Sequence, residues 1–156
     1  MSPLSHDIYL LPIDRAYAEA RIIVLEKEIQ DLGPDFNDAF TQSSETWHDN
    51  SPFEAVRDKQ SMLAAELHKL RTLVRQATLT PPKAKRGTIG VGHVVTLADG
   101  HKYQIAGDWT HQAGYHQDGM NTVSCHTPIA KALLGKKVGD EVKVARLDTV
   151  IMTIEK

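Results

Sequence analysis

The chain has 156 residues, of which 41% are apolar and 24% are charged. This balance is typical of a globular protein with one or two small domains and excludes a disordered chain. The formal net charge of −2 is unevenly divided, because residues 1–78 hold eight Lys/Arg against thirteen Asp/Glu and residues 79–156 hold ten against seven. An acidic first half argues against a nucleic-acid clamp, since phosphate binding needs clustered positive charge.

The sequence shows no membrane span, signal peptide or disulfide framework. The longest aliphatic run, Ile22–Leu25, is far below the roughly 18 residues of a membrane helix. The first fifteen residues contain Asp7 and Asp14 and no basic stretch ahead of an apolar block, unlike a secretory signal. A single cysteine, Cys125, can form neither an intramolecular disulfide nor a zinc cluster by itself. We therefore expect a cytoplasmic protein without membrane contact, stabilised by packing.

Two stretches of the first half repeat apolar residues at alternating steps of three and four, the spacing of a coiled-coil seam. The first series is Ile22, Leu25, Ile29, Leu32, Phe36 and Ala39, and the second is Phe53, Val56, Gln60, Leu63, Leu67, Leu70, Val74 and Ala77. Because only about a dozen residues separate the series, the chain must double back into antiparallel helices. The sequence therefore predicts an N-terminal extension over residues 1–12 and an antiparallel coiled-coil hairpin over residues 13–78.

Glycine, proline and helix-capping residues predict where these helices bend and turn. Gly33-Pro34 predicts a kink or short break in the first helix, because proline removes a backbone donor and clashes with the preceding turn. Ser51 as N-cap, Pro52 at the first helical position and Glu54 in a capping box mark the start of the second helix. Residues 43–50, which are polar and acidic, are therefore the tip of the hairpin.

A linker is expected over residues 79–87. It contains two adjacent prolines, which favour an extended chain, followed by the basic residues Lys83, Lys85 and Arg86. These basic side chains are either solvated linker residues, the interpretation we favour, or a contact with nucleic acid.

Beyond the linker the apolar period changes to two, which is typical of strands. Asp99-Gly100 marks a hairpin between strand-like runs, and further strands are expected at residues 121–125, 141–146 and 149–154. One short helix, Pro128–Leu134, is capped by Thr127 and stopped by Gly135. The predicted class is α+β, with residues 88–156 forming a small antiparallel sheet and one short helix.

Residues 124–142, Ser-Cys-His-Thr-Pro-Ile-Ala-Lys-Ala-Leu-Leu-Gly-Lys-Lys-Val-Gly-Asp-Glu-Val, resemble the signature of the bacterial GreA/GreB transcript-cleavage factors. Residues 91–97 and 103–108 look like the first strands of that family, and residues 49–50 with 55–60 look like the region near its hairpin tip. The resemblance covers residues 16–156. It implies an antiparallel coiled-coil hairpin followed by an FKBP-like C-terminal domain.

The resemblance also implies a function: binding to bacterial RNA polymerase at the rim of its secondary channel, with the hairpin reaching inward. Tip carboxylates of the family help to hold a second Mg²⁺ at the polymerase active centre, beside the 3′ end of backtracked nascent RNA. Two metals stabilise the attacking and leaving oxygens of an in-line phosphodiester displacement. The protein would be a monomeric accessory factor, not an enzyme, with no cofactor of its own and a Mg²⁺ ion shared with the polymerase.

The tip departs from the family pattern. Where the family has Asp-Leu-x-Glu-Asn, this chain has Thr46-Trp-His-Asp-Asn50, so the second acid is Asp49 and the first is replaced by Thr46. Glu45 lies next to it and can substitute if the loop shifts by one residue. Asp49 and Glu45 are thus the candidate catalytic and metal-contacting residues. Structural alternatives are a carboxylate that favours a helix N-terminus for Asp49 and a solvated loop acid for Glu45.

Two further tip residues are candidate contacts. Trp47 stands where the family has an aliphatic residue, and it either stacks on a base or packs against Phe53. Asn50 either orients the tip or serves as a turn residue.

Residues 126–129 match the family stretch that contacts the polymerase rim. His126 and Thr127 replace the usual Asp/Asn and Ser, and they are followed by Pro128 and Ile129. Helix capping by Thr127 and Pro128 is the structural alternative, and both roles are compatible.

The leading hypothesis is a Gre-type elongation factor that stimulates cleavage of backtracked RNA. The alternative within the family is a secondary-channel regulator that lacks cleavage activity and modulates or inhibits transcription. A peptidyl-prolyl isomerase is disfavoured because aromatic residues are few beyond the linker. A dimer built from the seams is disfavoured because the hairpin satisfies its own seam. The eight histidines, His111, His116 and His126 among them, lack the spacing of a zinc motif, so no dedicated metal cluster is expected.

Overall fold

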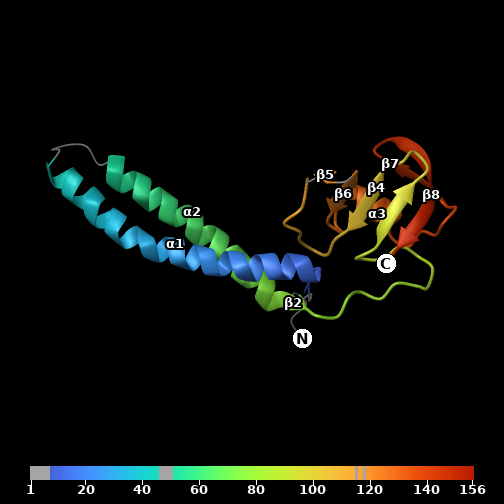
Figure 1. The fold of residues 1–156 in the computed structure, drawn as a ribbon, viewed down its shortest axis with the longest axis horizontal. Coiled ribbons are helices and arrows are strands. Elements are labelled where there is room, and N and C mark those ends of the chain that lie inside the picture. Colours follow the sequence, from blue (N-terminus) through green and yellow to red (C-terminus); the bar gives the residue numbers. More distant parts are fainter. Residues whose placement is uncertain (1–7, 46–50, 115, 118) are drawn as a thin grey trace, which may run out of the picture. The chain divides into compact units, whose positions relative to one another are not determined.

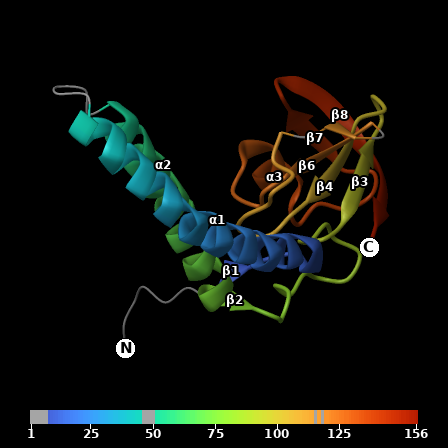
Figure 2. The same ribbon diagram turned by 60° about the vertical axis from the view of Figure 1, so that its left-hand side comes forward.

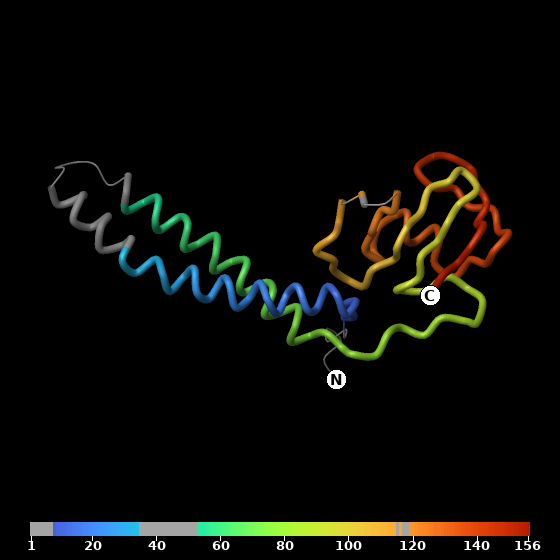
Figure 3. The backbone as a smooth tube through the Cα atoms, viewed as in Figure 1, coloured from blue at the N-terminus to red at the C-terminus, as the bar shows by residue number. Residues whose placement is uncertain are grey.

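The computed structural model describes residues 8–45, 51–114, 116–117 and 119–156. It forms two compact units, which we describe separately. One is the helical unit Ala16–Arg75, and the other joins the start of the chain, through Arg15, to Gln76–Lys156. Figure 1 shows the helices α1 and α2 followed by the strands of a sheet, and Figure 3 follows the same path as a backbone tube. In the described part of the chain, no helix is long and apolar enough to cross a membrane.

The helical unit is the predicted hairpin. Helices α1 (Pro12–Glu45) and α2 (Ser51–Gln76) lie side by side in two views (Figures 1 and 2). The predicted seam positions Leu25, Leu32, Leu67 and Leu70 are all buried, whereas the one polar member of the second series, Gln60, is exposed. Burial of one apolar stripe per helix therefore holds the hairpin together, as the three-four spacing predicts.

Ion pairs between the helices flank the buried seam. The Arg21 guanidinium donates from Nε to Glu66 Oε1 at 2.9 Å and from Nη2 to Glu66 Oε2 at 3.1 Å. Arg71 Nη2 donates to Glu26 Oε1 at 2.6 Å. The hydrogen bond from Arg21 lowers the pKa of Glu66 below its usual value. Both pairs are substantially exposed, so each contributes modestly to stability and mainly favours this pairing of the two helices.

The helices differ from the sequence prediction at two points, one within α1 and one at the end of α2. Helix α1 continues through Gly33-Pro34, so a break at this point is wrong. Proline removes one backbone hydrogen bond, while Leu32 beside it is buried in the seam and keeps the turn in place. Helix α2 ends at Gln76, two residues before the predicted end, because Ala77–Thr78 forms strand β2.

Strand β2 pairs in parallel with β1, Ile8–Tyr9, in register Ile8 with Ala77 and Tyr9 with Thr78. The start of the chain is therefore part of the same compact unit as the C-terminal sheet.

A six-stranded sheet forms most of the second unit, in the order β5-β6-β4-β3-β8-β7. Its strands are β3 (Val94–Leu97), β4 (Lys102–Ile105), β5 (His116–Gln117), β6 (Met120–Val123), β7 (Glu141–Val144) and β8 (Leu147–Glu155). The sheet is antiparallel as predicted except at one pair, because β4 and β6 are parallel. The long connection between them lets the chain cross over, which a tight turn cannot do.

One tight turn connects β3 to β4 and another connects β7 to β8. The predicted hairpin at Asp99-Gly100 is confirmed: Gly100 has a φ of 91° and its N–H donates to Leu97 O at 2.9 Å. The turn between β7 and β8 was predicted as strand but contains Ala145 and Arg146, with φ of 52° and 69°. Two positive φ angles are the geometry of a type I′ turn. Since neither residue is glycine, asparagine or aspartate, the sequence carries no turn signal there.

Helix α3 (Pro128–Leu133) packs its buried Ala130 and Leu133 into the core of the sheet. The rest of this core consists of Ile89, Val95, Leu97, Tyr103, Ile105, Val142, Val144 and Ile151. Thr127 caps the helix as predicted, since its Oγ1 accepts from Ala130 N at 3.2 Å. The predicted α+β class, a helical hairpin followed by a small sheet with one short helix, is confirmed.

Candidate functional site

Of the predicted tip, residues 43–45 are the end of α1 and residues 46–50 lie outside the described residues. Trp47, Asp49 and Asn50 belong to this undescribed stretch, as does the side chain of Glu45, which is the last residue of α1. Helix α1 ends at Glu45 and α2 begins at Ser51, so five residues connect the helices. The candidate acids are thus in or beside this connection, and their roles remain predictions.

The predicted polymerase-contacting stretch consists of a firmly held turn and the first two residues of α3. His126 and Pro128 are exposed, while Thr127 and Ile129 are half-buried, Ile129 against the core. The Thr127 hydroxyl donates to Ser124 O at 2.8 Å, and His126 N donates to Ser124 Oγ at 3.1 Å. Thr127 therefore has a structural role as a cap, and the same turn holds His126 and Pro128 at the surface.

Asp108 connects this turn to the start of the chain. Its Oδ2 accepts from Tyr9 N at 2.7 Å, and its Oδ1 lies 2.5 Å from His126 Nε2. Asp108 N in turn donates to Tyr9 O at 2.8 Å. The carboxylate thus uses one oxygen to hold strand β1 and the other to hold the histidine of the candidate contact stretch.

Cys125 lies beside this pair. One ligand-type atom from each of Asp108, Cys125 and His126 lies within 4.8 Å of the others. Burial, and secondarily the negative charge of Asp108, raise the pKa of the Cys125 thiol. The only local signal for this grouping in the sequence is the position of Cys125 next to a histidine.

Gly107 allows the start of the chain to pack against Asp108. A Cβ at this position would lie 1.9 Å from Tyr9 O and 2.7 Å from Tyr9 C, and only glycine has no such atom. Leu10 and Leu11, which follow in the chain, are both buried. The N-terminal segment is therefore built into this unit.

A second carboxylate, the buried Asp14, holds the next part of the same loop. Its side chain is fully buried, and its Oδ1 accepts from the Thr110 hydroxyl at 3.0 Å and from His111 N at 3.1 Å. The Nδ1 atom of His111 is 2.5 Å from the same oxygen. This contact ties the first turn of α1 to the loop after β4, and no local pattern in the sequence predicts it.

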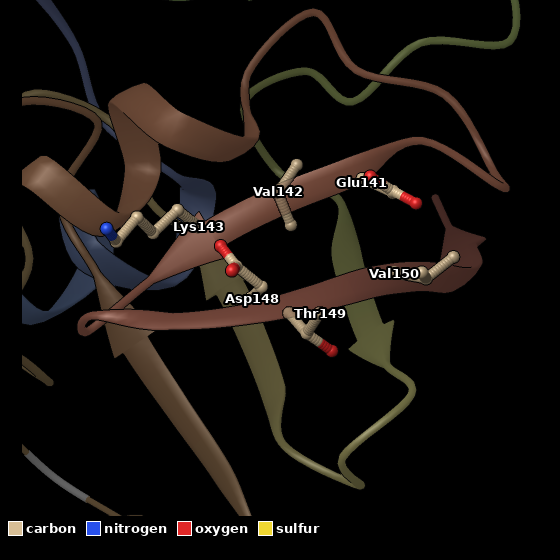
Figure 4. Close-up of a pocket in the computed structure, with 6 residues that line it drawn as sticks. All are labelled: Glu141, Val142, Lys143, Asp148, Thr149 and Val150. Atoms are coloured by element: carbon tan, nitrogen blue, oxygen red, sulfur yellow. The ribbon is translucent and has the colours of Figure 1, made fainter.

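A polar hollow of about 470 Å³ lies over the hairpin of β7 and β8 (Figure 4). Glu141, Lys143 and Asp148 line it together with Val142, Thr149 and Val150. Among these described residues there is no cysteine or histidine that could act as a nucleophile or base.

A second hollow, of about 460 Å³, lies between the linker and the end of α3. It is lined by residues 82–85 and 88–91 together with Leu134 and Gly135, and none of these residues is aromatic. Neither hollow has, among the described residues, the aromatic lining expected of a peptidyl-prolyl isomerase pocket.

The C-terminal part of the chain is similar to known proteins. Residues 83–156 match the family model described as "Transcription elongation factor, GreA/GreB, C-term". The transcription elongation factor GreA of Macrococcus caseolyticus is 34% identical over 101 residues, covering 62% of this chain and 61% of that protein. GreA of Nautilia profundicola is 32% identical over 102 residues, covering 62% and 60%. The matched region thus spans about three fifths of the length of these curated relatives.

Among solved structures, GreA factor homolog 1 of Thermus thermophilus is 20% identical, with a TM-score of 0.43 over 97% of this chain and 100% of that one. The family model and the curated relatives both indicate similarity to GreA/GreB transcription elongation factors. Residues 83–156 therefore form a domain of the GreA/GreB C-terminal type.

Proposed function

We propose that this protein binds bacterial RNA polymerase and stimulates the polymerase's own cleavage of backtracked RNA from within the secondary channel. The observation that carries the proposal is a GreA/GreB C-terminal domain joined to a helical hairpin that turns at acidic residues. Helix α2 has 26 residues, so at 1.5 Å per residue it is about 39 Å long. A narrow rod of this length suits a channel too small for a globular domain.

The tip residues Asp49 and Glu45 supply the chemistry in this proposal. Carboxylate oxygens are the ligands that Mg²⁺ prefers, and a second ion at the polymerase active centre stabilises charge on the reacting phosphodiester. The ion belongs to the polymerase complex, so this protein acts as an accessory factor and not as a free-standing enzyme. Trp47 and Asn50 would contact the channel or the RNA 3′ end beside these acids.

The turn before α3 is the proposed docking element. His126 and Pro128 are exposed on a backbone held by the hydrogen bonds to Ser124. Such a turn presents its side chains at little further cost in conformational entropy, because they are already positioned before binding.

A second function is favoured by one specific observation. Thr46 stands where the resemblance has the first acid of the tip, which leaves Glu45 as its substitute. If Glu45 does not reach the metal, the protein would occupy the channel without cleavage and modulate or inhibit transcription.

RNA cleavage in a purified, backtracked bacterial polymerase complex tests the proposal. The variants are Asp49→Ala and Glu45→Gln, with Asp31→Asn as the matched control, because Asp31 is an exposed acid on α1 away from the tip. Cleavage that falls at least tenfold in Asp49→Ala and persists in Asp31→Asn supports the first function.

The same complexes are assayed for binding, so that loss of docking is distinguished from loss of chemistry. Binding without cleavage by the unmodified protein favours the second function. Absence of both binding and cleavage contradicts the proposal.

A further inference from the structure

Three metal-ligating side chains converge, one from the loop after β4 and two from the turn before α3, and the proposed function uses them for no chemistry. Asp108, Cys125 and His126 each offer one ligand atom, and these atoms all lie within 4.8 Å of one another. We propose that Asp108, Cys125 and His126 form a binding site for a transition-metal ion, with Zn²⁺ as the best-matched metal.

The topology of the sheet brings these residues together. Strands β4 and β6 are parallel, with Ile105 opposite Val123, so the chain leaves both strands at the same edge of the sheet. Asp108 follows β4 by three residues, and Cys125 and His126 follow β6 by two and three residues. The three residues are thus close together because the parallel pairing of β4 and β6 places them there, and not because flexible surface side chains happen to touch.

The donor set selects the metal. A thiolate, an imidazole nitrogen and a carboxylate oxygen are all ligands that Zn²⁺ accepts, whereas Mg²⁺ and Ca²⁺ take oxygen ligands and gain little from a thiolate. Three protein ligands leave a fourth tetrahedral position for water.

Hydrogen bonds within the protein hold the three residues, as is usual for the ligands of protein metal sites. Asp108 Oδ2 is fixed by Tyr9 N at 2.7 Å, which directs Oδ1 towards His126. The backbone of Cys125 is fixed by its donation to Gly107 O at 3.1 Å, and that of His126 by its donation to Ser124 Oγ at 3.1 Å. The Asp108 carboxylate and the backbones of Cys125 and His126 are therefore held by hydrogen bonds that form independently of any ion.

Metal binding requires a small rearrangement. Bonds of about 2.0–2.3 Å in a tetrahedron place neighbouring ligand atoms about 3.3–3.6 Å apart, whereas Asp108 Oδ1 and His126 Nε2 are now 2.5 Å apart. His126 is exposed, so its ring can move outward by the roughly 1 Å that this needs. The Cys125 S–H bond breaks, the proton goes to solvent, and the thiolate sulfur bonds to the ion, so the charge balances.

Other histidine–carboxylate contacts in the described chain lack this convergence. His101 lies 3.0 Å from Asp99 but has no third ligand beside it among the described residues. It is therefore a matched control for adventitious binding to an exposed histidine–aspartate pair.

The test uses the full-length protein, purified free of metal, and titrates it with Zn²⁺ against a competing chelator. We expect one ion per chain, an affinity that falls at least tenfold in Cys125→Ser and in His126→Ala, and no change in His101→Ala. Thermal melts without metal establish that each variant is folded. Zinc should raise the melting temperature of the unmodified protein and of His101→Ala, because the ion binds the folded state.

Titration with Co²⁺ gives a readout that does not depend on the variants. The chain has a single cysteine, so a thiolate-to-cobalt charge-transfer band in the near ultraviolet reports Cys125 alone. A band that appears at one equivalent and disappears on adding Zn²⁺ supports the site. Absence of the band, or zinc affinity that is equal in the unmodified protein, Cys125→Ser and His126→Ala, overturns it. Because the measurement uses the isolated protein, its failure leaves polymerase binding untouched.

Discussion

Replacing Gly107 by alanine is the sharpest test of how the start of the chain is held. The added Cβ would lie 1.9 Å from Tyr9 O, 2.7 Å from Tyr9 C and 3.2 Å from Leu10 Cα. The first two are backbone atoms inside the range that real Cβ atoms do not enter, so no side-chain rotation relieves the contact. The segment from Ile8 to Leu11 has to move away from the loop after β4.

The expected cost follows from the contacts that this movement breaks. The two hydrogen bonds between Tyr9 and Asp108, at 2.8 and 2.7 Å, are worth about 0.5–1.5 kcal/mol for the neutral one and about 1.5–3 kcal/mol for the one to the carboxylate. Partial exposure of the buried Leu10 and Leu11 adds to this, while the freed residues regain backbone entropy. We expect a net loss of about 2–4 kcal/mol in the free energy of unfolding.

Urea and thermal unfolding of the unmodified protein, Gly107→Ala and Gly33→Ala measure this loss. For a chain of this size, the melting temperature should fall by roughly 4–16 °C in Gly107→Ala. Gly33→Ala is the control, because Gly33 lies in a helix with no atom within 4 Å of the added Cβ, and alanine favours a helix. A Gly107→Ala protein within about 0.5 kcal/mol of the unmodified one would refute the packing described for the start of the chain.

Three further substitutions test the hairpin and the cap. Glu66→Gln should lower the free energy of unfolding by about 0.2–1 kcal/mol at pH 7. Because Arg21 lowers the pKa of Glu66 in the folded protein, this difference should disappear in denaturant melts at low pH. The loss begins near the pKa of about 4.3 of an unfolded glutamate and is complete below the lower pKa of the folded state. Leu25→Ala, at a fully buried seam position, should cost about 2–5 kcal/mol in the same melts, and a cost under 1 kcal/mol would contradict the seam. Thr127→Ala should lose about 0.5–2 kcal/mol with the cap to Ala130 N, and Thr127→Ser should restore most of it.

Local patterns in the sequence were sufficient for the hairpin and for α3. The three-four spacing predicts burial of Leu25, Leu32, Leu67 and Leu70 because a helix presents these positions on one side whatever lies elsewhere in the chain. The cap of α3 by Thr127 is equally local, since its partner is three residues away.

Features that depend on contacts distant in sequence were not predicted. The parallel pairing of β4 and β6 depends on the path of residues 106–119, which carries no apolar period. The docking of Tyr9 on Gly107 is a backbone contact over 98 positions, and nothing at either residue signals the other. Asp108 and Cys125 meet only because that parallel pair brings both chain segments to one edge of the sheet.

Site-specific crosslinking from the hairpin tip measures the central claim most directly. A photo-crosslinking amino acid replaces Trp47, or replaces Leu147 at the exposed start of β8 as the control, and the protein is added to a backtracked bacterial polymerase complex carrying labelled nascent RNA. A factor that works from within the secondary channel should crosslink from position 47 to the polymerase active centre or the RNA 3′ end, and not from position 147. Crosslinks from position 47 that fall only on the outer surface of the polymerase, or none despite binding, would contradict it.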